Sequence, residues 1–183
     1  MNIIEVILIG IGLSMDATAV TITNSMVYKG LPKRRLMLMP LFFGVFQGLM
    51  PMLGFYTGNL FYEVISKYSG IVTFIILGII GGKMIWDNVF GKDDDEITSS
   101  PELTVKVLTL QAIATSIDAF AVGVSFCATN SPIFSSSTLI ALTTFICVIF
   151  AVVLGKKLGH LLESKAEIVG GLVLIAIGVK ALF

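Results

Sequence analysis

The sequence predicts an all-α integral membrane protein in which six transmembrane helices form two inverted-topology three-helix repeats. Three observations predict this fold. The chain is 56% hydrophobic and only 13% charged, whereas a soluble domain carries about 25% charged residues. Six long apolar segments are separated by polar or basic connections. Short motifs in the first half of the chain recur in the same order in the second half.

A helix that crosses a hydrocarbon core of about 30 Å needs about 20 mostly apolar residues. Six segments approach or exceed this length, and none shows the alternation that marks a transmembrane strand. We therefore expect helices at 3–27, 37–60, 68–88, 105–129, 135–155 and 166–182.

A polar or turn-forming stretch separates each pair of neighbouring segments. Gly and Pro interrupt a helical pattern, and runs of charge mark water-exposed connections. The connections are YKGLPKRRL at 28–36, FYEVISK at 61–67, VFGKDDDEITSSPELT at 89–104, the turn at 130–132, and KKLGHLLESK at 156–165. The acidic run at 93–96 indicates a solvated loop.

Lysine and arginine are unevenly distributed over these connections. By alternation, the first, third and fifth connections lie on one side of the membrane, and they carry most of the basic residues. Basic connections stay in the cytoplasm. We therefore expect a multi-pass protein whose termini are both extracytoplasmic.

The second half of the chain repeats motifs of the first half. The matched stretches are SMDA at 14–17 with SIDA at 116–119, LGFYTGNL at 53–60 with LGKKLGHL at 154–161, and IVTFIILGIIGGK at 71–83 with IVGGLVLIAIGVK at 168–180. Because each copy makes three crossings, the second copy enters the membrane from the opposite side. Inverted repeats are typical of secondary transporters, whose sites lie near the midplane between the halves. We therefore divide the chain into a first repeat at 1–88, a hydrophilic cytoplasmic connector at 89–104, and a second repeat at 105–183.

Each repeat carries one aspartate near the centre of its first helix, Asp16 in ILIGIGLSMDATAVTITN and Asp118 in the matching stretch. A charged carboxylate at the centre of a bilayer costs about 2.5–3.5 kcal/mol on insertion scales. We expect no basic side chain at that depth, because Lys83 and Lys180 lie nearer helix ends, where a long stem reaches the interface. A divalent cation, or protons that replace it, is then the simplest compensation. The pattern predicts exchange of a divalent cation for protons at a midplane carboxylate site.

Neutral oxygen groups complete the candidate metal site. Ser14 and Ser116 each precede an aspartate by two residues, and Gln47 lies near the middle of the second helix. Oxygen ligands suit cations such as Mg²⁺, Ca²⁺ and Mn²⁺, and we expect no His or Cys ligand of the kind that zinc or copper prefers. Two alternatives stay open. The serines can bond back to their own helix, and Gln47 can form an interhelical hydrogen bond.

Three further charged residues, Lys83, Asp87 and Glu167, are expected to support the site. Lys83 and Asp87 are four residues apart on the third helix and can pair locally. Glu167 begins the sixth helix, where the N-terminus favours a negative charge.

We do not expect an enzyme. An intramembrane aspartyl protease also uses two aspartates, but its two carboxyls have different roles, which repeat-equivalent positions do not suggest. Thiol–electron transfer is a weaker alternative, because Cys127 and Cys147 have no repeat counterparts. A net charge of zero gives no reason to expect nucleic acid as a partner. We expect no permanently bound cofactor, and the lipid bilayer and the transported ions are the expected partners.

Five stretches together resemble a known family: SMDA at 14–17, FGVFQGLMPMLG at 43–54, GGKMIWD at 81–87, ATSIDAFAVG at 114–123 and KAEIVGGLVLIAIGVK at 165–180. They are similar to the MntP family of bacterial manganese efflux pumps, which is related to the LysE-type exporters. The resemblance implies export of Mn²⁺, as the transported substrate, across the inner membrane, with Asp16 and Asp118 at the transport site. It also implies that Gln47 stands at a position that is acidic in some members, and Asp87 where many carry Glu. The runner-up is an exporter of another divalent cation or of an amino acid on the same scaffold.

Overall fold

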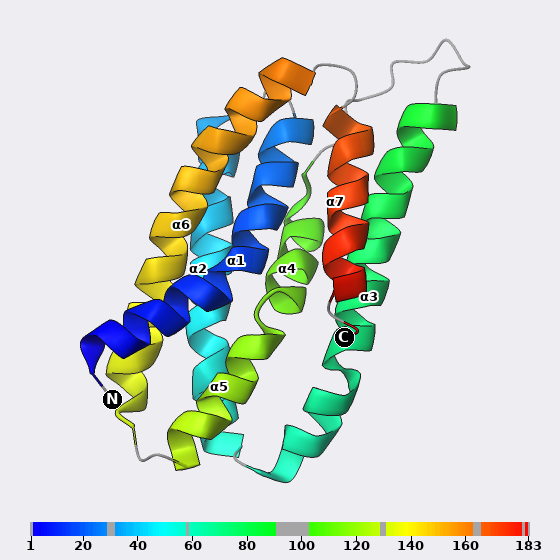
Figure 1. Cartoon of the computed structure of the whole chain (residues 1–183). Coiled ribbons are helices and arrows are strands. Elements are labelled where there is room, and N and C mark those ends of the chain that lie inside the picture. Colours follow the sequence, from blue (N-terminus) through cyan, green and yellow to red (C-terminus); the bar gives the residue numbers. More distant parts are fainter. Residues whose placement is uncertain are drawn as a thin grey trace.

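The structure is a computed structural model that describes residues 2–28, 32–57, 59–90, 103–128, 131–162, 166–180 and 182. These residues form seven helices and no strand. The helices are α1 (Ile3–Val27), α2 (Lys33–Thr57), α3 (Asn59–Phe90), α4 (Val105–Ala114), α5 (Ile117–Ala128), α6 (Ile133–Leu162) and α7 (Ala166–Lys180). They pack into one bundle (Figure 1). The expectation of an all-α fold is confirmed.

Several of these helices are long and apolar enough to cross a membrane. Three qualify on their own, at Ile3–Val27, Arg34–Thr57 and Ile133–Leu158, and α4 and α5 qualify together as one bent span. Shorter apolar stretches lie within α3 and α7, at Ile71–Lys83 and Ile168–Lys180. Among the described residues the structure thus supports a multi-pass protein, and the count of six spans stays a prediction.

Three expectations about helix continuity are wrong. In the connection expected at 156–165, residues 156–162 are helical, since α6 continues to Leu162. The helix expected at 105–129 is broken at Thr115–Ser116, and its two parts, α4 and α5, are bent by 43°. The polar turn expected at 61–67 is helical and belongs to α3. That stretch contains neither Gly nor Pro, so nothing in its backbone stops a helix that begins at Asn59.

Three hydroxyl groups bond to carbonyls just before the break between α4 and α5. The Thr115 hydroxyl donates to the Gln111 carbonyl at 3.0 Å, and the Ser116 hydroxyl donates to the Ala112 carbonyl at 2.6 Å. The Thr73 hydroxyl of α3 donates to the Ala114 carbonyl at 3.1 Å. Side-chain donors that compete with backbone N–H groups for carbonyls bend helices. The break places Asp118 in the first turn of α5.

The helices alternate in direction along the bundle. Figure 1 shows one end of the bundle formed by the last residues of α1, α3 and α6 together with the first residues of α2, α4 and α7. These ends flank the three basic connections, so the structure agrees with the alternation on which the expected orientation depends. Both chain termini lie away from that end (Figure 1).

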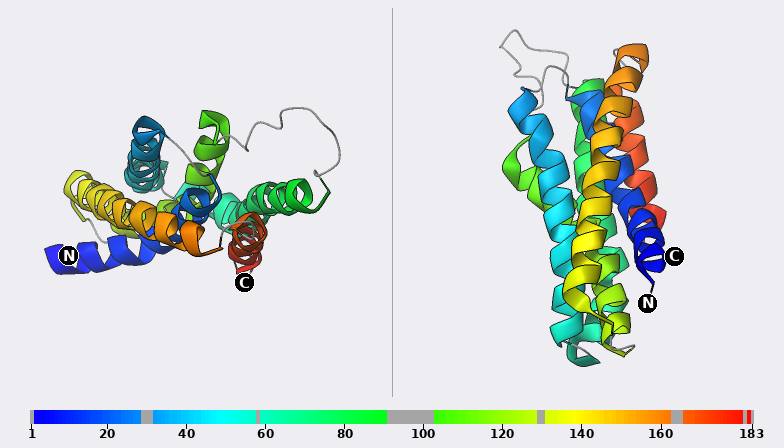
Figure 2. Two further views of the ribbon diagram at one scale, coloured as in Figure 1. Left: turned by 90° about the horizontal axis from the view of Figure 1, so that it is seen from above. Right: turned by 90° about the vertical axis from the view of Figure 1, so that its left-hand side faces the viewer.

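The two halves of the chain interlock. Helix α1 packs most extensively against α6, α2 against α6 and α5, and α3 against α7. Figure 2 shows the same interleaving from above and from the side. Each helix of the first half therefore has its main partner in the second half.

Two glycines from the repeated LG-x-x-x-G motif form matching contacts between the halves. A Cβ on Gly54 of α2 would meet the Phe120 carbonyl oxygen of α5, and a Cβ on Gly155 of α6 would lie 2.5 Å from the Ile22 carbonyl oxygen of α1. Each glycine helix thus packs closely on the aspartate helix of the opposite half. Small residues allow such close approach between membrane helices.

The contact between α3 and α7 follows a different correspondence from the sequence repeat. A Cβ on Gly81 would lie 2.5 Å from the Gly171 carbonyl oxygen, and a Cβ on Gly171 would lie 2.6 Å from that of Gly81. The contact is mutual and relates Gly81 to Gly171, whereas the motif match aligns Gly81 with Gly178. The repeat assignment of these two helices therefore stays a prediction.

Candidate cation site where two helices bend

A buried pair of amides sets the relative height of the two aspartate helices. The Asn24 Nδ2 donates to Gln111 Oε1 at 2.7 Å, and the Gln111 Nε2 donates to Asn24 Oδ1 at 3.1 Å. Both residues are 0% exposed. Helices α1 and α4 run in opposite directions (Figure 1), so eight residues back along α1 and seven residues forward along α4 lead in the same direction along the bundle. Asp16 and Asp118 lie in this direction from the amide pair, with Asp118 past the break, and the two carboxylates are within electrostatic range of each other.

Asp16 has a basic partner. Lys180 Nζ lies 3.5 Å from Asp16 Oδ1, with the lysine side chain 75% exposed and the aspartate side chain 35% exposed. The expectation that no basic side chain reaches this depth is therefore wrong. Helix α7 has 15 residues and rises about 22 Å, less than the about 30 Å of a hydrocarbon core. Its C-terminal end consequently lies partway along the bundle (Figure 1).

Asp118 lies near the same two groups without a basic partner of its own. It is within electrostatic range of both Asp16 and Lys180, and its Oδ1 accepts the Ala119 N–H at 2.8 Å. Its side chain is exposed in the isolated chain. In the described part of the chain, no ion pair joins Asp118 to a lysine or arginine. When both carboxylates are ionised, they and the one ammonium leave one negative charge without a counter-charge, and this arrangement can attract a further cation.

The serines beside the two aspartates both bond to carbonyls of their own helices. The Ser14 hydroxyl donates to the Ile11 carbonyl at 2.8 Å, as Ser116 does to Ala112 at the break in the second half. Figure 2 shows from above that the N-terminal part of α1 points away from the rest of the bundle. Both hydroxyls therefore bond back to their own helix, and their role as metal ligands stays a prediction.

Gln47 forms one of the two interactions considered for it. Its side chain is 0% exposed, and its Nε2 donates to the Leu13 carbonyl of α1 at 3.0 Å. The interhelical hydrogen bond is thus present. Its Oε1 is buried and has no hydrogen-bond partner, so the amide keeps an acceptor available for a cation or for water.

The remaining candidates are only partly described. Lys83 is exposed on α3 and forms no ion pair within the described residues. Asp87 and Glu167 belong to α3 and α7, but their side chains, and the acidic run at 93–96, lie outside the described part of the structure. Within the part that is described, no group of three or more His, Cys, Asp or Glu side chains is placed to hold a metal.

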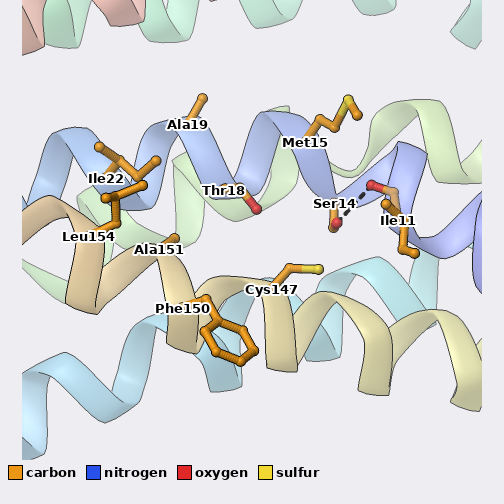
Figure 3. Close-up of a pocket in the computed structure, with 10 residues that line it drawn as sticks. All are labelled: Ile11, Ser14, Met15, Thr18, Ala19, Ile22, Cys147, Phe150, Ala151 and Leu154. Atoms are coloured by element: carbon orange, nitrogen blue, oxygen red, sulfur yellow. Dashed lines mark hydrogen bonds between the residues drawn. The ribbon is translucent and has the colours of Figure 1, made fainter.

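A groove on the other side of α1 is apolar. Its volume is about 410 Å³, and its lining includes Ser14 and Thr18 of α1 and Cys147 and Phe150 of α6. Figure 3 shows Ser14 turned toward the Ile11 carbonyl, and Met15 and Ala19 pointing to the opposite side of α1 from Thr18. Neither Asp16 nor Asp118 lines this groove, so it is distinct from the charged site.

Sequence reasoning missed three residues of the site: Asn24, Gln111 and Lys180. The two amides carry a visible signal, since each is a polar residue within an apolar helix. The sequence shows Lys180 but predicts the wrong depth for it. Its distance from the end of the helix does not give its distance from the membrane interface. The length of α7 was the signal that could have corrected this.

These features define a class of protein. An all-helical bundle with several apolar spans, one of them broken, brings two aspartates and a lysine from three helices near one another. The apolar spans define a multi-pass membrane protein.

Comparison with known proteins identifies the family. Residues 30–182 match the profile of the family described as "Mntp: Putative manganese efflux pump". "Putative manganese efflux pump MntP" of Ruminiclostridium cellulolyticum is 48% identical over 180 residues, covering 98% of this chain and 95% of the relative. The protein of the same name from Methanosarcina barkeri is 41% identical over 182 residues, covering 100% and 96%. No solved structure matches the chain. The chain belongs to the MntP family.

Proposed function

We propose that this protein exports Mn²⁺ from the cytoplasm across the inner membrane in exchange for protons, and that Asp16 and Asp118 form the transport site. The observation that carries the proposal is that the two aspartates, one from each half, lie within electrostatic range of each other and of the Lys180 ammonium, so that when both are ionised they share one counter-charge within the described residues. The names of the relatives support manganese as the substrate.

The donor set suits a hard or borderline cation. Mn²⁺ favours carboxylate, carbonyl and water oxygens. Two carboxylates, the free Gln47 Oε1 and backbone carbonyls near the break between α4 and α5 supply oxygen atoms, with Ser14 and Ser116 beside them. When the metal leaves, protons on the carboxylates lower the cost of two negative charges in an apolar region. Lys83, Asp87 and Glu167 would support the site from α3 and α7.

The contacts between the halves support alternating access. Gly54 packs on α5 and Gly155 packs on α1, so each half contributes a helix that can rock against the aspartate helix of the other. Rocking of one repeat against another around a fixed site is the usual mechanism of inverted-repeat transporters. We expect the end of the bundle with the basic connections to face the cytoplasm.

A second candidate function is export of an amino acid. This alternative needs a basic group at the level of the carboxylates, and Lys180 supplies one at 3.5 Å from Asp16. An ammonium beside two carboxylates can pair with both charged ends of a zwitterion. Another divalent cation is a further alternative that the oxygen ligands allow.

A growth and metal-content assay tests the proposal. Cells that lack their own manganese exporter would receive the intact chain, Asp16→Asn or Asp118→Asn, with membrane levels matched by immunoblot. We expect the intact chain to lower cell manganese and restore growth in excess Mn²⁺, and each Asn variant to lose at least tenfold of export, because a neutral amide cannot balance the metal's charge. Unchanged manganese with the intact chain would contradict the proposal. Parallel challenges with Fe²⁺, Mg²⁺ and amino acids distinguish the alternatives.

A further inference from the structure

Lys180 lies beside the proposed transport site but has no role in the proposed exchange of Mn²⁺ for protons. Its ammonium lies 3.5 Å from Asp16 and within electrostatic range of Asp118. We propose that Lys180 is a tethered cation that holds the carboxylate site in the absence of metal and is displaced from Asp16 when Mn²⁺ binds. This inference rests on the proposed function.

The geometry of the ion pair favours exchange. Tight charge-assisted hydrogen bonds between an ammonium and a carboxylate are about 2.7–2.9 Å long, whereas this pair is a single contact at 3.5 Å. The lysine side chain is 75% exposed, so it has room to leave without repacking of the bundle. The pair neutralises Asp16 but does not lock it in place.

The backbone of α7 is anchored independently of this pair. A Cβ on Gly171 would meet the Gly81 carbonyl oxygen of α3 at 2.6 Å, and a Cβ on Gly178 would lie 3.2 Å from Phe74 Cα. These two contacts lie about two turns apart on one face of α7 and hold that face against α3. Displacement of the ammonium therefore requires only rotation of the lysine side chain.

Charge balance favours withdrawal of the ammonium when Mn²⁺ binds. Once both aspartates have released their protons, the two carboxylates and the ammonium carry one net negative charge. Addition of Mn²⁺ with the ammonium in place would give one net positive charge, whereas addition with the ammonium withdrawn gives zero. Uncompensated charge is costly in an apolar environment, so binding of the metal favours withdrawal of Lys180.

Binding of Mn²⁺ to the full chain in lipid nanodiscs, followed by electron paramagnetic resonance of free Mn²⁺, tests the inference. Lys180→Gln removes the competing charge and should tighten binding by about two- to tenfold, the range expected for release of one partly exposed ion pair. Lys180→Arg keeps a cation there and should bind no more tightly than the intact chain. The matched control is Lys106→Gln, which removes an exposed lysine at the start of α4 that has no ion pair in the described residues and should leave the affinity unchanged.

The outcomes separate the two proposals. If the intact chain binds Mn²⁺ and Lys180→Gln does not bind it more tightly, the tethered-cation role is overturned while the transport site stands. Tighter binding by Lys180→Arg would overturn the role as well, and this variant decides the question if the Gln variant does not fold. If the intact chain binds no Mn²⁺, both proposals fail. In the background of Asp16→Asn, Lys180→Gln should have a smaller effect on Mn²⁺ affinity than in the intact chain, because the ammonium then keeps only its longer-range interaction with Asp118.

Discussion

Asp16 and Asp118 have different surroundings although they occupy matched positions in the sequence repeat. Asp16 has an ammonium at 3.5 Å, whereas Asp118 accepts the N–H of the next residue and has no basic partner in the described chain. A metal ion would therefore meet one carboxylate that already has a counter-charge and one that is open. We expect the unpaired Asp118 to make the first contact and Asp16 to complete the site.

The amide pair that sets the height of these carboxylates can be tested by substitution. Gln111→Leu leaves the buried Asn24 without a partner and should lower the free energy of unfolding by about 1–3 kcal/mol. Adding Asn24→Leu should recover most of this loss, since neither polar group then stays unsatisfied. Thermal unfolding in detergent micelles provides the measurement.

Thr109→Ala is the control for this pair, because the Thr109 hydroxyl is exposed and bonds only to its own helix at Val105. It should change stability by no more than about 0.5 kcal/mol. Equal losses in the single and the double leucine variants would show that the two amides do not act as a pair.

Among the helices, the break between α4 and α5 is the element that positions Asp118. Thr115→Ala combined with Ser116→Ala removes both hydroxyls and frees the Ala112 carbonyl to accept the N–H of residue 116, which now donates to the Ile113 carbonyl. We expect a straighter helix, stability that is unchanged or higher, and export reduced by about tenfold or more, because Asp118 leaves the level of Asp16. Export is measured as loss of cell manganese at matched expression.

Thr138→Ala provides the comparison for the break, since the Thr138 hydroxyl donates to the Phe134 carbonyl at 2.7 Å in the uninterrupted helix α6. This variant should keep export. If the double variant at 115 and 116 also exports normally, the break does not position the site.

Hydropathy and spacing could predict the helices but not their continuity. The apolar segments, the two aspartates and the glycine motif can each be identified from a short stretch of sequence, without knowledge of the rest of the chain. The break at Thr115 also depends on Thr73, which is 41 residues away from the Ala114 carbonyl it binds. The depth of Lys180 likewise depends on how α7 packs against α3, and distance from a helix end does not reveal it.

At the scale of the whole molecule, the glycine contacts between the halves should control both stability and transport. In Gly54→Ala and Gly155→Ala, the added Cβ overlaps backbone oxygens of α5 and α1, which cannot move as a flexible side chain does. We expect each variant to lose about 1–3 kcal/mol of stability and much of its export. Unfolding in micelles and cell manganese content are the measurements.

Gly78→Ala is the matched control, because a Cβ there has no neighbour within 4 Å. In the interior of helix α3, alanine should be neutral or stabilise by up to about 1 kcal/mol. Equal effects at positions 54, 155 and 78 would mean that the close contacts between the halves carry no special weight.

The interlocking of the halves has a consequence for how the chain can be divided. Gly54 of α2 packs on α5, and Gly155 of α6 packs on α1. Each contact therefore joins the half before the hydrophilic connector to the half after it. A half produced alone would expose its closely packed glycine surface to lipid. Fragments 1–90 and 103–183 should each be degraded when made singly and should accumulate as a working heterodimer when made together. A gene interrupted at the connector would therefore still encode a functional transporter, made of two polypeptides that each require the other to escape degradation.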